Sequence, residues 1–266
     1  MSHYLLEVKD LNCRFEIERN LFSKNKYLHV LKNINFNLKQ GSTLGIVGES
    51  GCGKSTLCRT ILSLNNKETG NIKWFSKDID QFSKKEFKNF RKKVQIIFQD
   101  PYGSLNPRMT IGNIISEPLE IYKKENDKKS KTLKVLDVME KVGLSDLLFN
   151  RFPHELSGGQ CQRVGIARSI INEPDVLICD EPVSSLDLSV QSQILDLLKS
   201  LKNKLNITMV FVSHDLAVVK SISDEVMVLK QGVMVEKSSA EQVFNKPKDE
   251  YTKKLISSVP RINNIG

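Results

Sequence analysis

A glycine-rich run carries the clearest chemistry in this 266-residue chain. Residues Gly48-Glu49-Ser50-Gly51-Cys52-Gly53-Lys54-Ser55 match the pattern G-x-x-x-x-G-K-[ST] at every position, and Thr56 continues into a helix-like segment. Glycines let successive backbone N–H groups point at phosphate oxygens, and a helix N-terminus adds its positive dipole. We expect Lys54 to neutralise the β- and γ-phosphates and the Ser55 hydroxyl to ligate Mg²⁺. A chance glycine-rich turn is the alternative, and the complete match in this context disfavours it.

Two carboxylates follow an apolar segment later in the chain. Val176–Cys179 is typical of a short buried strand, and it leads directly into Asp180 and Glu181. Open α/β sheets bind ligands at the carboxyl ends of their strands. Asp180 is therefore predicted to hold Mg²⁺, and Glu181 to polarise or deprotonate an attacking water. A solvated acidic turn is the rival interpretation, and the phosphate-binding run makes it the weaker one.

A second glycine pair lies in Leu156-Ser157-Gly158-Gly159-Gln160, before the helix-like stretch Cys161–Ile171. In purely structural terms, Ser157 could cap that helix and the glycines could form a turn. In functional terms, a serine and glycine N–H groups at a helix start form an anion site. A second anion site makes sense if the γ-phosphate belongs to a nucleotide bound on a partner subunit.

The elements that must position these residues alternate between strands and helices. Strands are predicted at Tyr4–Val8, Asn33–Leu38, Thr43–Val47, Val94–Phe98, Val176–Cys179 and Ile207–Val212, followed by a hairpin of Val226–Leu229 and Val233–Val235 around Gln231-Gly232. From about Met109 to Ile171 the pattern is helical, and one helix face is predicted to comprise Leu133, Leu136, Met139 and Val142. Strands alternating with helices imply a mostly parallel α/β sheet, into which a helical subdomain is inserted.

Composition narrows the class of protein. No apolar run approaches the length of about 18–20 residues that spans a bilayer, and Glu7 and Asp10 stand where a signal peptide would be apolar. The five cysteines show no metal-ligand spacing, so reduced thiols in a cytosol are expected. The net charge of +9 suits nucleic acid, an anionic membrane surface or simply a solvated lysine-rich surface. Charge alone does not decide among these partners, and the lysine clusters Lys84–Lys93 and Lys123–Lys131 show no aromatic ladder of the kind that stacks bases. No nucleic-acid partner is predicted.

Taken together, these motifs resemble the ATP-binding subunits of ABC transporters over nearly the whole chain. The family's motifs occur in the family's order: the P-loop, a Q-loop glutamine at Gln99, the LSGGQ signature, the Walker B strand, a D-loop at Ser185-Leu186-Asp187 and a switch histidine at His214. The resemblance implies that Gln99 senses Mg²⁺ and the attacking water, that His214 contacts the γ-phosphate, and that Asp187 communicates across a dimer.

The same resemblance implies a fold and a set of partners. The fold class is α/β, with a P-loop NTPase (RecA-like) core sheet, an N-terminal antiparallel β subdomain and an inserted α-helical signature subdomain. One ABC ATPase domain is predicted over residues 1–266, with its nucleotide-binding core at 1–98 and 173–240, its helical subdomain at 99–172 and a tail at 241–266. A second ATPase subunit is expected, with a paralogue favoured and a homodimer as the alternative. ATP would be sandwiched between one P-loop and the other subunit's signature.

Finer features are similar to the peptide and nickel importer branch of that family. They are the segment from Gln99 to Arg108, the segment from Ser213 to Val219, and a tail containing Tyr251-Thr252-Lys253-Lys254-Leu255. The resemblance implies ATP and Mg²⁺ as ligands, two transmembrane permeases, an extracytoplasmic solute-binding protein and a place on the cytoplasmic face of the membrane. Tyr102–Pro107 is the candidate surface for contact with the permeases.

Several alternatives remain open. Peptide uptake is the favoured function, import of nickel or another small solute is the alternative, and a non-transport ATPase acting on nucleic acid is the third. The aromatic residue that stacks on adenine is Phe15 by its offset, with Phe22 and Tyr27 as alternatives. Cys161 follows the signature where many members of the family carry arginine, and we expect it to tune packing or phosphate contacts.

Overall fold

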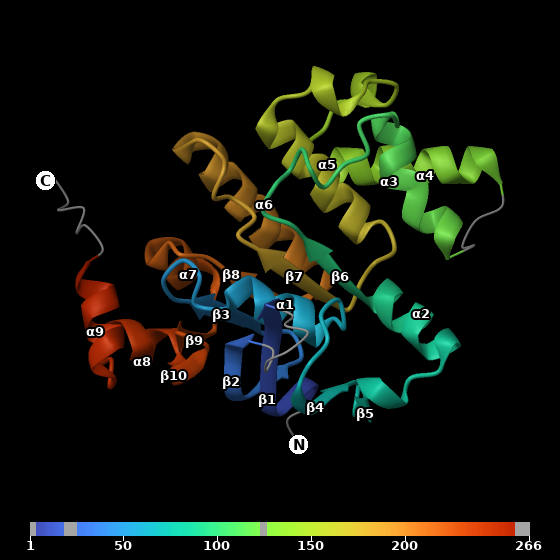
Figure 1. Ribbon diagram of the computed structural model, residues 1–266. Coiled ribbons are helices and arrows are strands. Elements are labelled where there is room, and N and C mark those ends of the chain that lie inside the picture. Colours follow the sequence, from blue (N-terminus) through green and yellow to red (C-terminus); the bar gives the residue numbers. More distant parts are fainter. Residues whose placement is uncertain (1–3, 19–25, 123–126, 259–266) are drawn as a thin grey trace, which may run out of the picture. The chain divides into compact units, whose positions relative to one another are not determined.

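The computed structural model describes residues 4–18, 26–122 and 127–258 (Figure 1). Its strands are β1 (Tyr4–Glu18), β2 (Lys26–Lys39), β3 (Thr43–Val47), β4 (Thr69–Trp74), β5 (Lys77–Asp78), β6 (Val94–Ile97), β7 (Val176–Asp180), β8 (Thr208–Val212), β9 (Glu225–Lys230) and β10 (Val233–Ser239). Its helices are α1 (Lys54–Ile61), α2 (Lys84–Lys93), α3 (Ile111–Ile121), α4 (Lys128–Lys141), α5 (Gly158–Ile170), α6 (Leu188–Leu205), α7 (Leu216–Ile222), α8 (Ala240–Asn245) and α9 (Glu250–Ser257). Short 3₁₀ turns occur at η1 (Ile79–Gln81), η2 (Asp146–Leu148) and η3 (Pro153–Glu155).

Two compact units make up the fold. Unit 1 comprises Met1–Ser83 and Val210–Gly266, and unit 2 comprises Lys84–Met209. None of the helices in the described ranges is long and apolar enough to cross a membrane.

Unit 1 combines antiparallel and parallel strand pairing, as predicted. An antiparallel sheet has the order β2-β1-β4-β5. Separately, β3 runs parallel to β9, and β9 pairs antiparallel with β10. All five residues of β3 are buried, which explains why its sequence does not alternate between apolar and polar residues. β3 ends at Val47, immediately before the first glycine of the glycine-rich run.

The β9–β10 hairpin turns at Gln231-Gly232, as its sequence predicts. Both residues have positive φ, 46° and 79° respectively, which is the backbone of a two-residue type I′ turn. Glycine is required at the second position for a further reason. A Cβ on Gly232 would lie 2.1 Å from the carbonyl oxygen of Val30, so the turn can sit directly against β2 only without a side chain.

Helix α1 is held by its apolar face and by its last turn. Leu57, Cys58 and Ile61 are fully buried. Helix ends leave backbone carbonyls without intrahelical partners, and the buried indole N–H of Trp74 donates to the carbonyl of Ile61 over 2.8 Å. The tryptophan on β4 therefore fixes the end of the helix that begins at Lys54.

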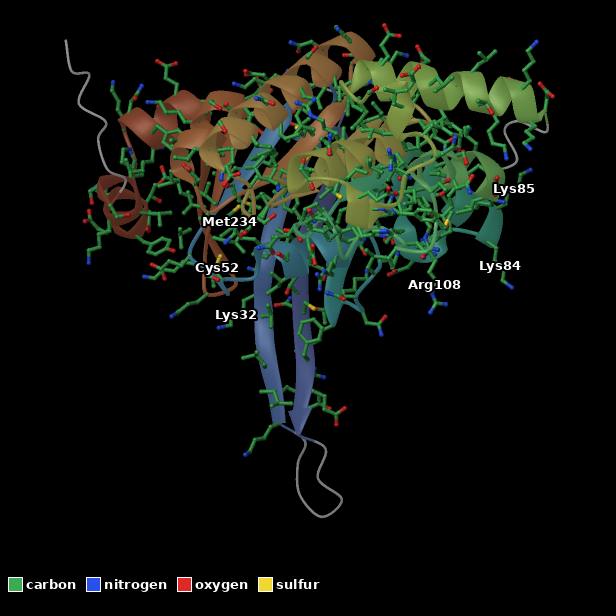
Figure 2. The ribbon with its side chains drawn as sticks, turned by 90° about the horizontal axis from the view of Figure 1, so that it is seen from above. Lys32, Cys52, Lys84, Lys85, Arg108 and Met234 are labelled. Carbon is green, nitrogen blue, oxygen red and sulfur yellow. The ribbon has the colours of Figure 1, made fainter. Side chains whose placement is uncertain are left out.

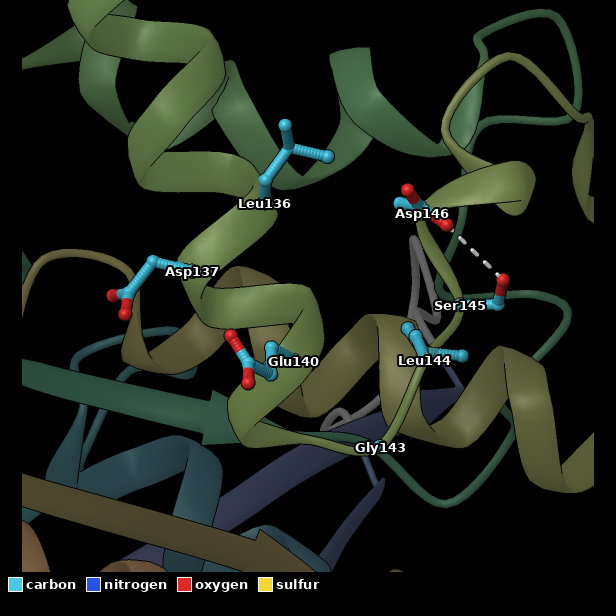
Figure 3. Close-up of a pocket in the computed structure, with 7 residues that line it drawn as sticks. All are labelled: Leu136, Asp137, Glu140, Gly143, Leu144, Ser145 and Asp146. Atoms are coloured by element: carbon cyan, nitrogen blue, oxygen red, sulfur yellow. Dashed lines mark hydrogen bonds between the residues drawn. The ribbon is translucent and has the colours of Figure 1, made fainter.

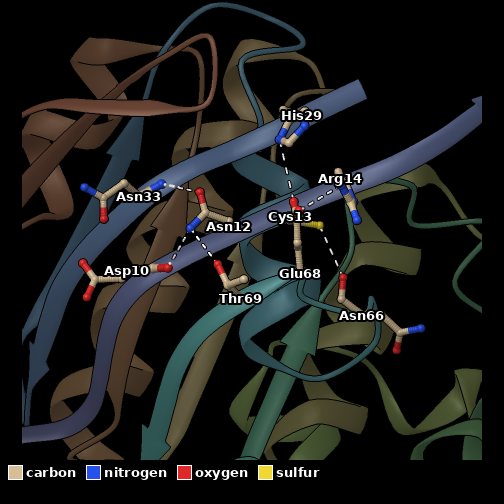
Figure 4. A network of polar contacts seen from close by, with 9 residues as sticks. All are labelled: Asp10, Asn12, Cys13, Arg14, His29, Asn33, Asn66, Glu68 and Thr69. Carbon is tan, nitrogen blue, oxygen red and sulfur yellow. Dashed lines mark hydrogen bonds and ion pairs between the residues drawn. The ribbon is translucent and has the colours of Figure 1, made fainter. Parts of the chain in front are cut away.

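The β1–β2 ribbon is irregular, and one side chain stabilises the irregularity (Figure 4). Asp10 and Asn33 adopt left-handed φ values of 49° and 48°. The Asn12 amide nitrogen donates to Asp10 O (2.8 Å) and to Thr69 Oγ1 (2.9 Å), and its oxygen accepts from the Asn33 N–H (3.0 Å). One asparagine thus connects β1 to both neighbouring strands where the regular ladder is interrupted.

Unit 2 contains the helical segment and the parallel pair β6–β7. The predicted helix face at Leu133, Leu136, Met139 and Val142 is wrong in part. Leu133 is 60% exposed, whereas Val135, Val138, Met139 and Val142 are buried. A series with steps of three residues turns steadily away from one face, because each step covers 300° of a 360° turn. The real stripe mixes steps of three and four, which keeps it on one face.

We predict that Asn12→Ala lowers the free energy of unfolding by about 1–3 kcal/mol, because two backbone groups and one hydroxyl lose their partner. Urea denaturation followed by circular dichroism measures this loss. Asn71→Ala, at an exposed position on β4, is the matched control and should change stability by less than about 0.5 kcal/mol. Equal midpoints for the two variants would contradict the role assigned to Asn12.

Candidate nucleotide-binding and hydrolysis site

The glycine-rich run Gly48–Ser55, called the nucleotide loop below, adopts a backbone that needs its glycines. Gly53 has φ 109° and immediately precedes α1. Gly48 has φ 154°, and a Cβ there would lie 2.2 Å from the carbonyl of Leu229. Side chains at these two positions would strain the loop or push it away from β9. The loop therefore presents bare backbone at the N-terminus of a helix, which suits a phosphate group.

Lys54 places its charge inside this loop. Its side chain is 4% exposed, and Nζ donates to the carbonyls of Gly48 (2.8 Å) and Glu49 (3.0 Å). A buried ammonium group needs such hydrogen bonds because desolvation is costly. Backbone oxygens carry no full charge, so a phosphate would compete well for the same ammonium group.

The register of β1 and β2 distinguishes two of the three candidates for adenine stacking. Phe15 pairs with Leu28 and Glu16 pairs with Tyr27, so Phe15 and Tyr27 lie on opposite faces of the ribbon. Phe15 shares its face with Cys13, whose sulfur accepts from the Thr60 hydroxyl of α1.

Tyr27, in contrast, lies under the guanidinium of Arg14, 4.3 Å from the ring centroid. Both rings are partly exposed, at 39% for Phe15 and 43% for Tyr27. Of these two rings, only Phe15 shares by strand alternation the face of Cys13. The third candidate, Phe22, lies outside the described residues.

In unit 2, two predicted site residues meet at the ends of parallel strands. Ile97 of β6 pairs with Cys179 of β7, so Gln99 and Glu181 each lie two residues beyond paired positions. The Gln99 Nε2 atom donates to Glu181 Oε2 over 3.2 Å. Glu181 has a left-handed φ of 49°, which costs about 1 kcal/mol or more in a non-glycine residue. Backbone strain of this kind is common at active sites, where it positions a catalytic side chain.

The donors predicted for Mg²⁺ have the right chemistry. Asp180 is the last residue of β7 and is 2% exposed. Mg²⁺ prefers hard oxygen ligands, commonly one or two protein groups together with phosphates and waters. The Asp180 carboxylate, the Ser55 hydroxyl and the Gln99 amide oxygen all belong to that class.

The segment Leu156–Gln160, called the signature segment, forms a capping box. Ser157 Oγ accepts from the Gln160 N–H (3.3 Å), and Gln160 Oε1 accepts from the Ser157 N–H (2.9 Å). Gly158 and Gly159 are the first residues of α5. A Cβ on Gly159 would lie 2.6 Å from Val190 Cγ1, so this glycine also allows α6 to approach. The capping role that the sequence suggested is present, and it leaves the Gly158 and Gly159 backbone at a helix N-terminus.

The polypeptide after Gln99 is bonded directly to the signature segment. The Tyr102 hydroxyl donates to the carbonyl of Leu156 over 3.1 Å. Arg168 of α5 donates to the carbonyl of Ser104 over 2.8 Å, and burial lowers the pKa of this guanidinium, with Glu117 opposing the shift. Sequence reasoning missed Arg168, because no local pattern marks a contact across 64 residues.

Two further predicted residues occupy helix starts. Asp187 precedes α6 and is exposed, and its carbonyl accepts from the Gln191 N–H. In unit 1, exposed His214 stands between β8 and α7. Its neighbour Asp215 caps α7 by accepting from the Ala217 and Val218 N–H groups.

Unit 2 also has a pocket of about 690 Å³ that none of the predicted site residues lines (Figure 3). Its lining comes from the end of α4 and the segment after it, and it comprises Leu136, Asp137, Glu140, Gly143, Leu144, Ser145 and Asp146. Its polar lining comprises three carboxylates and one hydroxyl, a negative surface that does not suit a phosphate group.

We predict that Cys161 resists alkylation at pH 8 in the native protein. Its thiol is fully buried, and burial raises its pKa to about 11. The reactive thiolate is therefore scarce below that pH. Iodoacetamide labelling read by peptide mass spectrometry tests this, with the protein unfolded in guanidinium as the positive control. Rapid labelling of the folded chain at pH 8 would show that Cys161 is accessible and ionised.

Comparison with known proteins agrees with this geometry. Residues 31–184 match the family described as ABC transporter. The chain is 51% identical to the oligopeptide transport ATP-binding protein OppF of Haemophilus influenzae, over 96% of this chain and 78% of that protein. It is 44% identical to the dipeptide transport ATP-binding protein DppF of Escherichia coli, over 97% of this chain and 77% of that protein.

Solved structures of ATP-binding cassettes have the same fold. The cassette MJ0796, in a dimeric post-hydrolysis state bound to ADP and Pi, matches with a TM-score of 0.78 and 27% identity over 88% of this chain and 98% of that one. The protein cbiO1 from Clostridium perfringens, part of the transporter complex cbiONQ, matches with a TM-score of 0.77 and 31% identity over 97% of both chains. The predicted fold class is confirmed, and the chain belongs to the ABC transporter family as one of its ATP-hydrolysing cassettes.

Proposed function

We propose that this ABC ATPase couples ATP hydrolysis to the uptake of peptides across the cytoplasmic membrane. The observation that carries the proposal is similarity over nearly the full chain to proteins named as oligopeptide and dipeptide transport ATP-binding proteins. It agrees with the branch features in the sequence, at Gln99–Arg108 and in the tail around Tyr251.

The nucleotide loop binds the phosphates of ATP in this proposal. The backbone from Gly51 to Thr56 faces them at the start of α1, and Lys54 moves from the Gly48 and Glu49 carbonyls to the β- and γ-phosphates. Ser55, Asp180 and Gln99 hold Mg²⁺, which neutralises charge on the phosphates when it is bound. Phe15 stacks on adenine, because it alone of the described candidates shares a ribbon face with the side chain that contacts α1.

Hydrolysis depends on Glu181 in this proposal. Its carboxylate accepts a proton from the attacking water, and the Gln99 amide, 3.2 Å away, fixes its orientation. His214 contacts the γ-phosphate and stabilises its developing charge. Glu181 is the first residue after β7 and has a left-handed backbone.

The working unit is a pair of such chains bound to membrane subunits. Ser157, Gly158, Gly159 and Gln160 contact the partner's nucleotide, and Asp187 relays between the two sites. Two permeases bind on the membrane side, and an extracytoplasmic solute-binding protein delivers the peptide. The surface at Tyr102–Pro107 contacts a permease in this proposal, which is supported by its hydrogen bonds to the signature segment and to α5.

We predict that Glu181→Gln lowers the ATPase rate at least about 100-fold, because a general base is lost. Affinity for ATP should stay within about twofold, since the nucleotide loop is unchanged. Glu173→Gln, at an exposed position before β7, is the control and should hydrolyse ATP normally. Phosphate release and equilibrium nucleotide binding measure the two effects. Equal turnover by Glu181→Gln and the wild type would refute this mechanism.

We predict that Phe15→Ala weakens ATP binding about tenfold, because a stacked base is worth about 1–3 kcal/mol. Tyr27→Ala should change the affinity by less than about twofold, because Tyr27 faces the other side of the ribbon and packs on Arg14. Equilibrium titration with a fluorescent ATP analogue measures both. A larger effect for Tyr27→Ala than for Phe15→Ala would assign the adenine to the other face.

The choice of solute is tested with the complex purified from membranes through a tag on this chain. Peptide-loaded binding protein should stimulate ATP hydrolysis in proteoliposomes, and nickel should not. Stimulation of ATP hydrolysis by nickel alone would contradict peptide uptake and identify nickel as the transported solute. Recovery of the chain with nucleic acid and without permeases would exclude transport.

A further inference from the structure

The C-terminal helix α9 brings a tyrosine to the nucleotide loop. The Tyr251 hydroxyl oxygen accepts a hydrogen bond from the backbone N–H of Glu49 over 3.2 Å, although the two residues are 202 positions apart. Glu49 is the first residue after Gly48, where the chain leaves β3 and enters the loop. One N–H group at the entry to the loop is thus satisfied by a side chain from the far end of the sequence.

A buried carboxylate holds α9 in place. Glu236 of β10 is only 8% exposed. Its oxygens accept from the backbone N–H groups of Lys248 (3.0 Å) and Asp249 (3.1 Å), just before the helix. Asp249 then caps α9 by accepting from the Tyr251 N–H over 2.8 Å. A carboxylate that is desolvated and satisfied by backbone donors is a firm anchor.

The Tyr251 ring is also fixed. The Lys230 ammonium group lies 5.0 Å from the ring centroid. The pKa of the hydroxyl is raised, chiefly by burial; the hydrogen bond from the Glu49 N–H opposes the shift, and the Glu49 and Cys52 side chains add to it. The hydroxyl therefore stays protonated and neutral at physiological pH.

A second contact ties the loop to the same part of the chain. The Gly232 N–H, in the β9–β10 turn, donates to the carbonyl of Cys52 over 2.9 Å, and the Gly232 carbonyl accepts from the Lys32 N–H over 2.8 Å. Figure 2 shows Cys52 beside Lys32 of β2 and Met234 of β10. Two backbone groups of the loop, on either side of Gly51, are therefore held by elements that follow residue 224.

We propose that Tyr251 is a positioning residue for ATP binding: its hydroxyl fixes the entry of the nucleotide loop, so that affinity for ATP depends on α9. The inference rests on the proposed function, in which this loop binds ATP. It assigns a role to the tail sequence Tyr251–Leu255, which the motifs of the nucleotide site leave unexplained. Tyr251 acts through the Glu49 backbone and touches no reacting atom.

The first test is Tyr251→Phe, which keeps the ring on Lys230 and removes only the hydroxyl. The dissociation constant for ATP and the KM should rise about threefold to tenfold, the range expected for one lost hydrogen bond. The kcat should stay within about twofold, because the hydrolytic residues are unchanged. Tyr122→Phe is the matched control, since Tyr122 also lies beneath a lysine, Lys88. This substitution should leave the dissociation constant for ATP, the KM and the kcat unaltered.

The second test asks whether Glu236 affects ATP binding through Tyr251. Glu236→Gln weakens the anchor of α9 and should raise the KM for ATP by a similar factor. In a double-mutant cycle, adding Glu236→Gln to Tyr251→Phe should produce little further change, because the anchor acts through the missing hydroxyl. Multiplicative effects of the two substitutions would show that Glu236 acts by another route.

The outcomes separate this inference from the function on which it rests. Unchanged ATP affinity in Tyr251→Phe, with a wild type that binds ATP, overturns the role of Tyr251 alone. A wild type that binds no ATP overturns the proposed function. A melting temperature lowered by more than about 4 °C, with the KM unchanged, would show that the hydroxyl serves only stability.

Discussion

A loop that binds phosphates through its backbone must keep several N–H groups uncommitted, and much of unit 1 follows from that constraint. Such a loop cannot be stabilised by a regular ladder of its own hydrogen bonds. Its fixed points must come from outside. Here β9 lies so close to Gly48 that no side chain fits between them, and Gly232 bonds to the carbonyl of Cys52. The I′ turn at Gln231-Gly232 is thus part of the loop's support and not merely a connection.

The same constraint extends to the helix that follows the loop. The residues proposed to contact phosphate at the first turn of α1 can do so only if the helix axis is fixed. Leu57 and Ile61 bury one face of α1, and Trp74 takes up a carbonyl at its last turn. A short helix of this kind is marginal on its own. Tertiary contacts along one face and at the last turn therefore set the direction of the helix dipole.

Parts of this arrangement were predictable because they depend on local spacing. The capping residues Ser157 and Gln160 and the I′ turn each involve residues within four positions of one another, and the nucleotide loop is one unbroken run of eight residues. In all three, local backbone geometry relates residue type to structure. The meeting of Gln99 with Glu181 was not predicted, although two parallel strands that end in polar residues could have suggested it. The adenine-stacking aromatic was ambiguous, because the bulges in β1 and β2 disturb the alternation from which faces are counted.

Other parts depend on contacts that no spacing encodes. Arg168 reaches Ser104 across 64 residues, and Tyr251 reaches Glu49 across 202. Each uses an ordinary side chain that would be unremarkable on a surface. Each also bonds to a backbone group, so the partner's residue type leaves no trace in the sequence. Backbone groups next to a functional motif must be held in place while the side chains of the motif stay available for ligand. A side chain from a distant part of the chain can supply the hydrogen bond without any change in the motif's own residues.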